Sequence, residues 1–171
     1  CLTEFGFDDE LVRETPMTTR EGLYEDTNEY MPESAEAKLC KSFIGQLQFF
    51  VRGSRWDIAS TVSFLAQQMA KPTVSLLKAL KHLAGYLKGT AEFGLSGQRP
   101  TEGDTFHYFT DSSHSLPRSQ TGVLALMNGI PLKWRSARQA RASDSPECSE
   151  IYALKEGARD FRLMQWVAGE M

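Results

Sequence analysis

The chain contains little cysteine and no long run of apolar residues. Its three cysteines, Cys1, Cys40 and Cys148, are far apart, odd in number and outside any metal-ligand spacing. This pattern favours reduced thiols over a disulfide framework or a zinc site. No apolar run approaches the roughly 20 residues of a membrane helix, and the first residues do not resemble a signal peptide. We therefore expect an intracellular protein without a membrane-spanning segment.

An excess of positive charge is also absent. The 171 residues carry a formal net charge of -3, whereas a dedicated nucleic-acid binder is usually basic overall. Any contact with nucleic acid must therefore come from a local patch. Hydrophobic residues make up 41% and charged residues 24%, which excludes global disorder and predicts one ordinary domain or two small ones. Because the first residue is Cys1 rather than methionine, we expect a segment excised or processed from a longer protein.

Helical periodicity dominates the first half of the chain. Residues 1–33 are polar and rich in turn formers, which predicts an extended N-terminal arm. Apolar residues then recur at helical spacing in three stretches, residues 35–51, 56–70 and 73–88. Thr73 is placed to cap the third helix. Because the links are short, residues 34–95 are predicted to form a small antiparallel three-helix bundle.

Strand signals dominate the second half, residues 96–171, which begins with a stretch rich in glycine and polar residues. The predicted order is three strands and then a helix, at residues 105–111, 121–127, 130–136 and 145–168. Asn128-Gly129 is a strong signal for a tight hairpin between the second and third strands. Ser145 can cap the helix, with Pro146 at its first position. The whole pattern predicts an α+β fold.

Two acidic residues stand out by position. Asp111 closes the first predicted strand, and Glu150 lies in the first turns of the last helix. The helix face of Glu150 is shared by Leu154, Gly157, Phe161 and Met164. A carboxylate on an apolar face is costly unless its charge is compensated, as a metal ion and a second carboxylate would do. The alternative is that Glu150 lies at the edge of this face and reaches water, and spacing alone favours that alternative.

A series of short motifs carries a family resemblance. In order along the chain, they are FGF (5–7), TPM (15–17), KSFIGQL (41–47), RWDI (55–58), LKHL (80–83), YLKGT (86–90), YFTD (108–111), SQTG (119–122), WRSARQ (134–139) and SEIYAL (149–154). Their order and spacing resemble those of copia-type LTR retrotransposon Pol polyproteins over essentially the whole chain. The resemblance implies the end of a reverse transcriptase, followed by an incomplete RNase H-like α/β unit.

The resemblance also implies a chemistry. RNase H uses about four carboxylates to hold two Mg²⁺ ions and hydrolyses the RNA strand of an RNA–DNA hybrid. Asp111 matches the first metal-binding acid of the family, and Glu150 matches the second. The family's third acid lies on the next strand, beyond the end of this sequence, so we expect a weak Mg²⁺ site and no activity in this chain alone. The family commonly reads Asp-Ala-Asp-Trp where this chain has Asp111-Ser112-Ser113-His114.

Basic residues form a second candidate site. Lys78, Lys81, His82 and Lys88 lie on the polar side of the third predicted helix, and Arg135, Arg138 and Arg141 follow the hairpin. Both groups could track the phosphates of an RNA–DNA hybrid. The alternative is a solvated helix face and a sheet edge that is protected by charge.

Two functions are compatible with this sequence. In the first, the chain is a retroelement-derived reverse transcriptase/RNase H fragment with an ancestral role in hybrid binding and RNA hydrolysis. In the second, it is a repurposed, non-catalytic structural or interaction subunit of a larger assembly. The negative net charge favours this second function, and so does Ser113, which stands where the family commonly has the second Asp of Asp-Ala-Asp. In either case, we expect another protein chain to cover the open sheet edge and the last helix. Trp56, Trp134 and Trp166 are expected in the core rather than as stacking platforms for bases.

Overall fold

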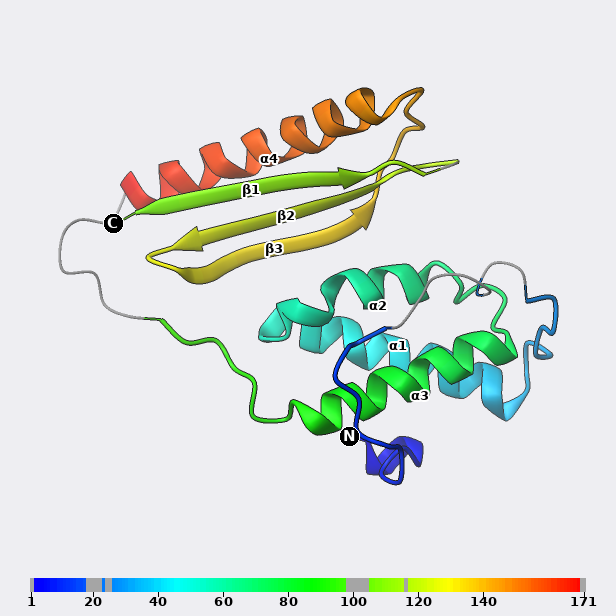
Figure 1. Cartoon of the computed structure of the whole chain (residues 1–171). Helices are drawn as coiled ribbons and strands as arrows, with labels where there is room; N and C mark the ends of the chain where they lie inside the picture. The colour runs from blue at the N-terminus through cyan, green and yellow to red at the C-terminus, as the bar shows by residue number, and fades with distance from the viewer. Residues whose placement is uncertain (1, 18–22, 24–25, 98–104, 116, 170–171) are drawn as a thin grey trace. The chain divides into compact units, whose positions relative to one another are not determined.

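The chain divides into two compact units, Cys1–Gly94 and Leu95–Met171 (Figure 1). The computed structural model describes residues 2–17, 23, 26–97, 105–115 and 117–169, so Cys1 lies outside the described residues. These residues contain four α-helices and a three-stranded antiparallel sheet, which confirms the α+β class. The finer division into an arm, a bundle and an RNase H-like domain stays a prediction. No helix in this described part is both long and apolar enough to span a bilayer.

The first unit contains the predicted helices, α1 (Ala35–Gly53), α2 (Ala59–Ala66) and α3 (Val74–Gly89). The middle helix is shorter than predicted. It is preceded by a 3-10 turn, η2 (Trp56–Ile58), and after Ala66 the amides of residues 67–69 bond to carbonyls three residues back. The chain therefore leaves the helix as a series of turns before Pro72. Thr73 caps α3 as predicted, because its side chain accepts from the amide of Leu76 at 3.2 Å.

The core of this unit includes both the helices and the N-terminal segment. Its fully buried side chains include Phe43, Leu47, Leu65, Leu80 and Leu83. Phe7, which follows a 3-10 turn, η1 (Thr3–Phe5), joins this core with its ring centroid 4.9 Å from that of Phe43. The polar composition of residues 1–33 did not indicate this contribution.

The N-terminal segment also lies closely against α3. The amide of Arg13 donates to the carbonyl of Gly85 at 3.3 Å, and a Cβ atom added to Gly85 would lie 2.1 Å from the carbonyl oxygen of Leu11. His82 Nε2 lies 2.9 Å from the carbonyl oxygen of Thr15. The absence of a side chain at Gly85 therefore allows the backbone of the segment to approach the helix.

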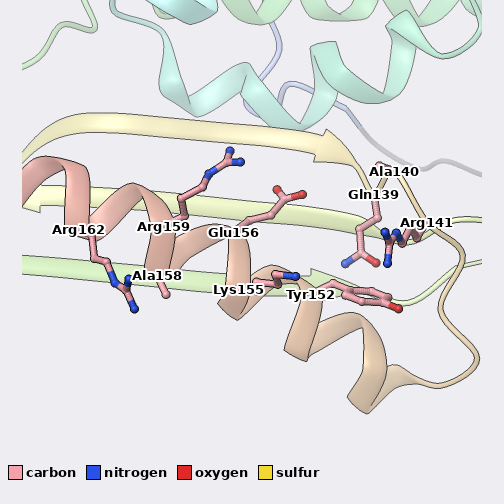
Figure 2. A pocket seen from close by; sticks show the side chains of 9 residues that line it. All are labelled: Gln139, Ala140, Arg141, Tyr152, Lys155, Glu156, Ala158, Arg159 and Arg162. Atoms are coloured by element: carbon pink, nitrogen blue, oxygen red, sulfur yellow. The ribbon is translucent and has the colours of Figure 1, made fainter.

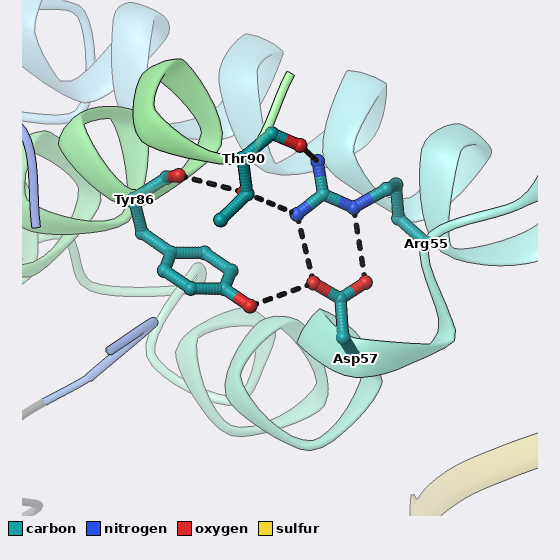
Figure 3. Close-up of polar contacts among 4 residues, drawn as sticks. All are labelled: Arg55, Asp57, Tyr86 and Thr90. Carbon is teal, nitrogen blue, oxygen red and sulfur yellow. Dashed lines mark hydrogen bonds and ion pairs between the residues drawn. The ribbon is translucent and has the colours of Figure 1, made fainter. Parts of the chain in front are cut away.

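A polar cluster joins η2 to the end of α3 (Figure 3). Arg55 donates to both carboxylate oxygens of Asp57, at 3.0 and 2.7 Å, and to Thr90 O and Oγ1, at 3.1 and 2.7 Å. Tyr86 Oη donates to Asp57 at 3.0 Å. Burial raises the pKa of Asp57, but the hydrogen bonds from Arg55 and Tyr86 and the charge of Arg55 outweigh this and leave the pKa lowered. These residues of the RWDI and YLKGT motifs therefore hold the helical unit together.

The second unit is a three-stranded meander and a long helix. Its elements are β1 (Phe106–Ser113), β2 (Gln120–Met127), β3 (Ile130–Arg138) and α4 (Pro146–Gly169). The strands are antiparallel in the order β1-β2-β3. The predicted hairpin is confirmed, since Met127 pairs with Ile130 and the turn residues Asn128 and Gly129 have φ angles of 53° and 79°. Positive φ at both central residues is what a tight type I′ turn requires.

Helix α4 packs along β1 and β2 (Figure 1). Ser145 caps its start as predicted, because Ser145 Oγ accepts from the amide of Cys148 at 3.2 Å. A Cβ atom added to Gly157 would lie 2.2 Å from Thr110 Cγ2 and 2.9 Å from Tyr108 Cε1. Gly157 therefore sets how closely α4 approaches β1.

Two core predictions are wrong. Trp56 is 42% exposed and Trp166 is 64% exposed, whereas Trp134 is half-buried. Leu154, on the face of the last helix that another chain was expected to cover, is 61% exposed. The buried face of α4 runs through Ala153 and Gly157, so Leu154 lies to one side of it.

Candidate functional site

Asp111 and Glu150 come to neighbouring positions at the end of β1. Asp111 is paired in register with Gly122, and Glu150 lies in the first turns of α4. Glu150 Oε1 accepts a hydrogen bond from the backbone amide of Ser112 at 3.2 Å. The carboxylate of Glu150 is thus held beside the residue that follows Asp111. Both acids are exposed, so a ligand could reach them.

Polar side chains fix the start of α4 on the sheet. Ser112 Oγ lies 3.0 Å from Ser149 Oγ, and Gln139 Nε2 donates to Ser149 O at 2.9 Å and to Thr121 Oγ1 at 3.1 Å. Ser149, Thr121 and Gln139 are all buried. The position of Glu150 is therefore set by buried contacts of the adjacent residue rather than by a flexible loop.

The side chain of Asp111 leaves β1 on the face opposite to α4, the helix that carries Glu150. Side chains alternate between the two faces of a strand. Because Ser112 contacts α4, alternation places Asp111 on the opposite face. A shared ion would therefore have to lie at the free edge of β1, where Glu150 accepts from the Ser112 amide. The prediction that the two carboxylates face each other across one ion stays a prediction.

Asp111 and Glu150 offer the type of oxygen ligand that a hard cation prefers, but they supply only two side chains. Carboxylate oxygens are the side-chain ligands that Mg²⁺ prefers. Across the residues that the structure describes, no three His, Cys, Asp or Glu side chains are grouped so that they could hold a metal ion. Asp111 and Glu150 fit as two ligands, and water or further oxygen atoms would have to complete the coordination.

Two of the three predicted α3 lysines are engaged by the N-terminal segment. Lys81 Nζ pairs with Glu10 Oε1 at 3.3 Å. Lys88 Nζ donates to the backbone carbonyls of Asp8 and Glu10. Lys78 is exposed and has no ion pair with a described residue. Phosphates would therefore compete with the N-terminal segment for two of these cations.

The two predicted arginines of β3 differ in their surroundings. Arg135 Nη1 forms an ion pair with Glu156 Oε2 on α4 at 3.0 Å. Arg138, the last residue of the strand, is exposed. Arg135 therefore links β3 to α4, whereas Arg138 forms no ion pair with a described residue.

The structure places three cations that were not predicted as site residues beside Arg141, which was. Lys155, Arg159 and Arg162 of α4 line one pocket with Arg141, which follows β3 (Figure 2). Their spacing of four and three residues, visible in the sequence, would have placed the α4 residues on one side of a helix.

The fold and the acid pair define an α+β chain with two neighbouring carboxylates at the end of its first strand. No family model matches the chain, and no solved structure matches it. The curated proteins that are similar to it include the following three. Secreted RxLR effector protein 161 of Plasmopara viticola is 28% identical over 70% of this chain and 86% of its own length. A transposon Ty5-1 protein of Saccharomyces cerevisiae is 27% identical over 74% of this chain and 41% of its own length.

The third relative is the retrovirus-related Pol polyprotein from transposon RE1 of Arabidopsis thaliana, which is 27% identical over 74% of this chain. The chain spans 9% of that polyprotein and less than half of the Ty5-1 protein. Retrotransposon Pol polyproteins are therefore homologues of this chain over most of its length, which confirms the resemblance found in its motifs.

Proposed function

We propose that the chain is a retroelement Pol segment that spans the end of a reverse transcriptase and the start of an RNase H-like domain. Its role is to bind an RNA–DNA hybrid and to contribute two carboxylates to the hydrolysis of the RNA strand. The observation that carries the proposal is the hydrogen bond from the Ser112 amide to Glu150, which holds one acid beside Asp111. The homology to transposon Pol polyproteins supports the substrate class.

Asp111 and Glu150 are the residues that would hold Mg²⁺. When bound, the metal would supply an activated water and stabilise the leaving oxygen. The Ser112 amide orients the Glu150 carboxylate, and the contact between Ser112 and Ser149 holds the first turns of α4 against β1. Because Mg²⁺ requires about six oxygen ligands, we infer that these two acids alone do not support hydrolysis.

Titration with Mn²⁺ or Mg²⁺ tests the metal-binding role. We expect the full chain to bind Mn²⁺ with a dissociation constant on the order of 1 mM. Asp111→Asn and Glu150→Gln should each weaken binding by about tenfold or more, because each removes a direct ligand. Glu92→Gln, which removes an exposed acid of the first unit, is the control and should leave binding unchanged. Equal Mn²⁺ affinity in all four proteins would refute the role of the pair.

A cleavage assay tests the inferred inactivity. We expect no cleavage of an RNA–DNA hybrid by the chain alone with either metal. Cleavage that is abolished by Asp111→Asn would show instead that the two acids suffice for hydrolysis.

A second candidate function is a non-catalytic interaction subunit. The observation that favours it is exposed apolar surface on α4, where Ile151 and Leu154 are 62% and 61% exposed. Phe109 of β1, at an edge of the sheet, is also exposed. In this role, another protein chain covers the β1 edge and α4.

A further inference from the structure

A basic pocket lies on the flank of α4, beside the segment that follows β3. It has a volume of about 540 Å³. Its charged and aromatic lining consists of Arg141, Tyr152, Lys155, Glu156, Arg159 and Arg162. Figure 2 shows these side chains projecting from successive turns of α4 and from the segment at residues 139–141. Gln139 also lines the pocket, and its side-chain nitrogen Nε2 is held by hydrogen bonds to Thr121 Oγ1 and Ser149 O.

Ion pairs with β3 already neutralise the acids on this part of α4. Glu156 pairs with Arg135 at 3.0 Å, and Asp160 pairs with Lys133 at 3.0 Å. In contrast, the four pocket cations form no ion pair with a described residue. The pocket is therefore locally positive in a chain whose net charge is -3.

The spacing of these cations is unfavourable for a helix without a ligand. Lys155 and Arg159 are four residues apart, so two like charges lie one above the other on the helix surface. Such pairs destabilise an isolated helix, and an anion bound between them relieves the repulsion. The arrangement therefore favours an anionic ligand over solvent alone.

We infer that this pocket binds the phosphodiester backbone of a nucleic acid strand. The inference rests on the proposed function for the class of its ligand, an RNA–DNA hybrid, and adds a contact surface separate from Asp111 and Glu150. Three of the four cations are arginines, whose planar guanidinium groups bind phosphate oxygens in pairs.

The geometry fits a row of phosphates better than a single small anion. Lys155 to Arg162 spans seven residues of helix, or about 10 Å, which equals the rise of about three phosphates along one strand. Tyr152 lines the same pocket and offers an aromatic ring for an exposed base.

The test is the salt dependence of binding by the full chain. The probes are a fluorescein-labelled RNA–DNA hybrid and the same RNA as a single strand. The pocket variant is Arg159→Ala with Arg162→Ala. The charge-matched control is Lys41→Ala with Arg52→Ala, which removes two exposed cations of α1 that have no ion pair with a described residue.

For the hybrid, we expect the pocket variant to reduce the slope of log affinity against log salt by about 1.8, since each lost phosphate contact removes about 0.9. At about 0.1 M salt, the same loss weakens binding by up to about sixtyfold. The control should match the unmodified chain in slope and affinity. Unchanged circular dichroism in both variants would show that the fold is retained.

The outcomes separate this inference from the proposed function. If the pocket variant binds the hybrid with unchanged slope and affinity, the pocket inference is wrong and the hybrid-binding role stands. If pocket-dependent binding is seen only with the single-stranded RNA, the pocket is a phosphodiester site but the proposed substrate is wrong. If the unmodified chain binds neither probe, both proposals are wrong, whatever the Mn²⁺ titration shows.

Discussion

At the scale of single residues, the Arg55–Asp57 pair is a strong determinant of stability in the helical unit. The side chain of Arg55 is 9% exposed and that of Asp57 is 23% exposed, so water screens the pair only partly. Arg55 also bonds to both oxygen atoms of Thr90, and its pKa is raised, first by the hydrogen bonds to Asp57. Removing one partner would leave the other charge buried without compensation.

We predict that Asp57→Asn lowers the free energy of unfolding by about 2 kcal/mol at pH 7, because a charge-assisted, partly buried pair is lost. The pKa of Asp57 is lowered in the folded state. The pair therefore stabilises fully above the unfolded pKa of about 4, and its contribution is lost as the pH falls below that value. Urea unfolding at pH 7 and at pH 3 measures both effects.

The control for this prediction is Asp9→Asn, an exposed acid for which no shift of stability is expected. The difference between Asp57→Asn and the unmodified chain should narrow at pH 3, because the unfolded chain takes up a proton at Asp57 below a pKa of about 4, whereas the lowered pKa of the folded state resists this protonation. A difference that is equal at both pH values would contradict an electrostatic origin.

At the scale of elements, the contact between α4 and β1 positions the candidate site. Gly157 packs against Thr110 and Tyr108, and one helical turn further along, Phe161 meets the ring of Tyr108 edge-on with centroids 5.8 Å apart. Burial raises the pKa of Tyr108 to about 12, with a further contribution from the charges of nearby acids. This packing sets the distance between α4 and the sheet. It therefore also determines whether the Glu150 carboxylate can accept the hydrogen bond from the Ser112 amide.

We predict that Gly157→Ala destabilises the protein by about 1–3 kcal/mol, because the added methyl group overpacks the helix–strand contact. Gly45→Ala is the matched control, since Gly45 is also helical but has no neighbour within 4 Å of an added Cβ atom. There, the higher helix propensity of alanine should stabilise by up to about 1 kcal/mol. Thermal unfolding followed by circular dichroism would measure opposite signs, and stabilisation by both substitutions would contradict the close approach.

At the scale of the whole molecule, exposed apolar surface on α4 is the observation from which we predict an association. Ile151 and Leu154 lie on neighbouring turns outside the contact with the sheet. Leaving apolar surface in water costs about 25 cal/mol per Å². Strand β1, which packs against α4, lies at an edge of the sheet. An edge strand offers backbone groups for pairing with a further strand.

We predict that the isolated chain self-associates at micromolar concentration, and that Leu154→Glu reduces this association by placing a charge in the contact. Sedimentation velocity over a concentration series provides the measurement. Leu11→Glu, at an exposed position of the N-terminal segment, is the control and should associate like the unmodified chain. A monomer at all concentrations, with no effect of either substitution, would refute the need for a covering partner.

Much of the local structure was predictable from particular residues. Asn128-Gly129 specified the hairpin because few other residues adopt positive φ at both turn positions. Ser145 and Thr73 specified two helix starts because their side chains cap free amides. The end of α2 was not predictable, since its apolar spacing continues to residue 70 while the hydrogen bonds change to turns after Ala66.

The sequence by itself determined the elements, their order and the family, because spacing, capping and motif order are local properties of the chain. Only the tertiary structure decided which charges are free. Two of the three α3 lysines are engaged by a segment more than 70 residues away, through contacts such as that of Lys81 with Glu10. Among the described residues, no acid pairs with Lys155, Arg159 or Arg162, because Glu156 and Asp160 of α4 pair with β3. Such partners are distant in sequence, and packing alone brings them together.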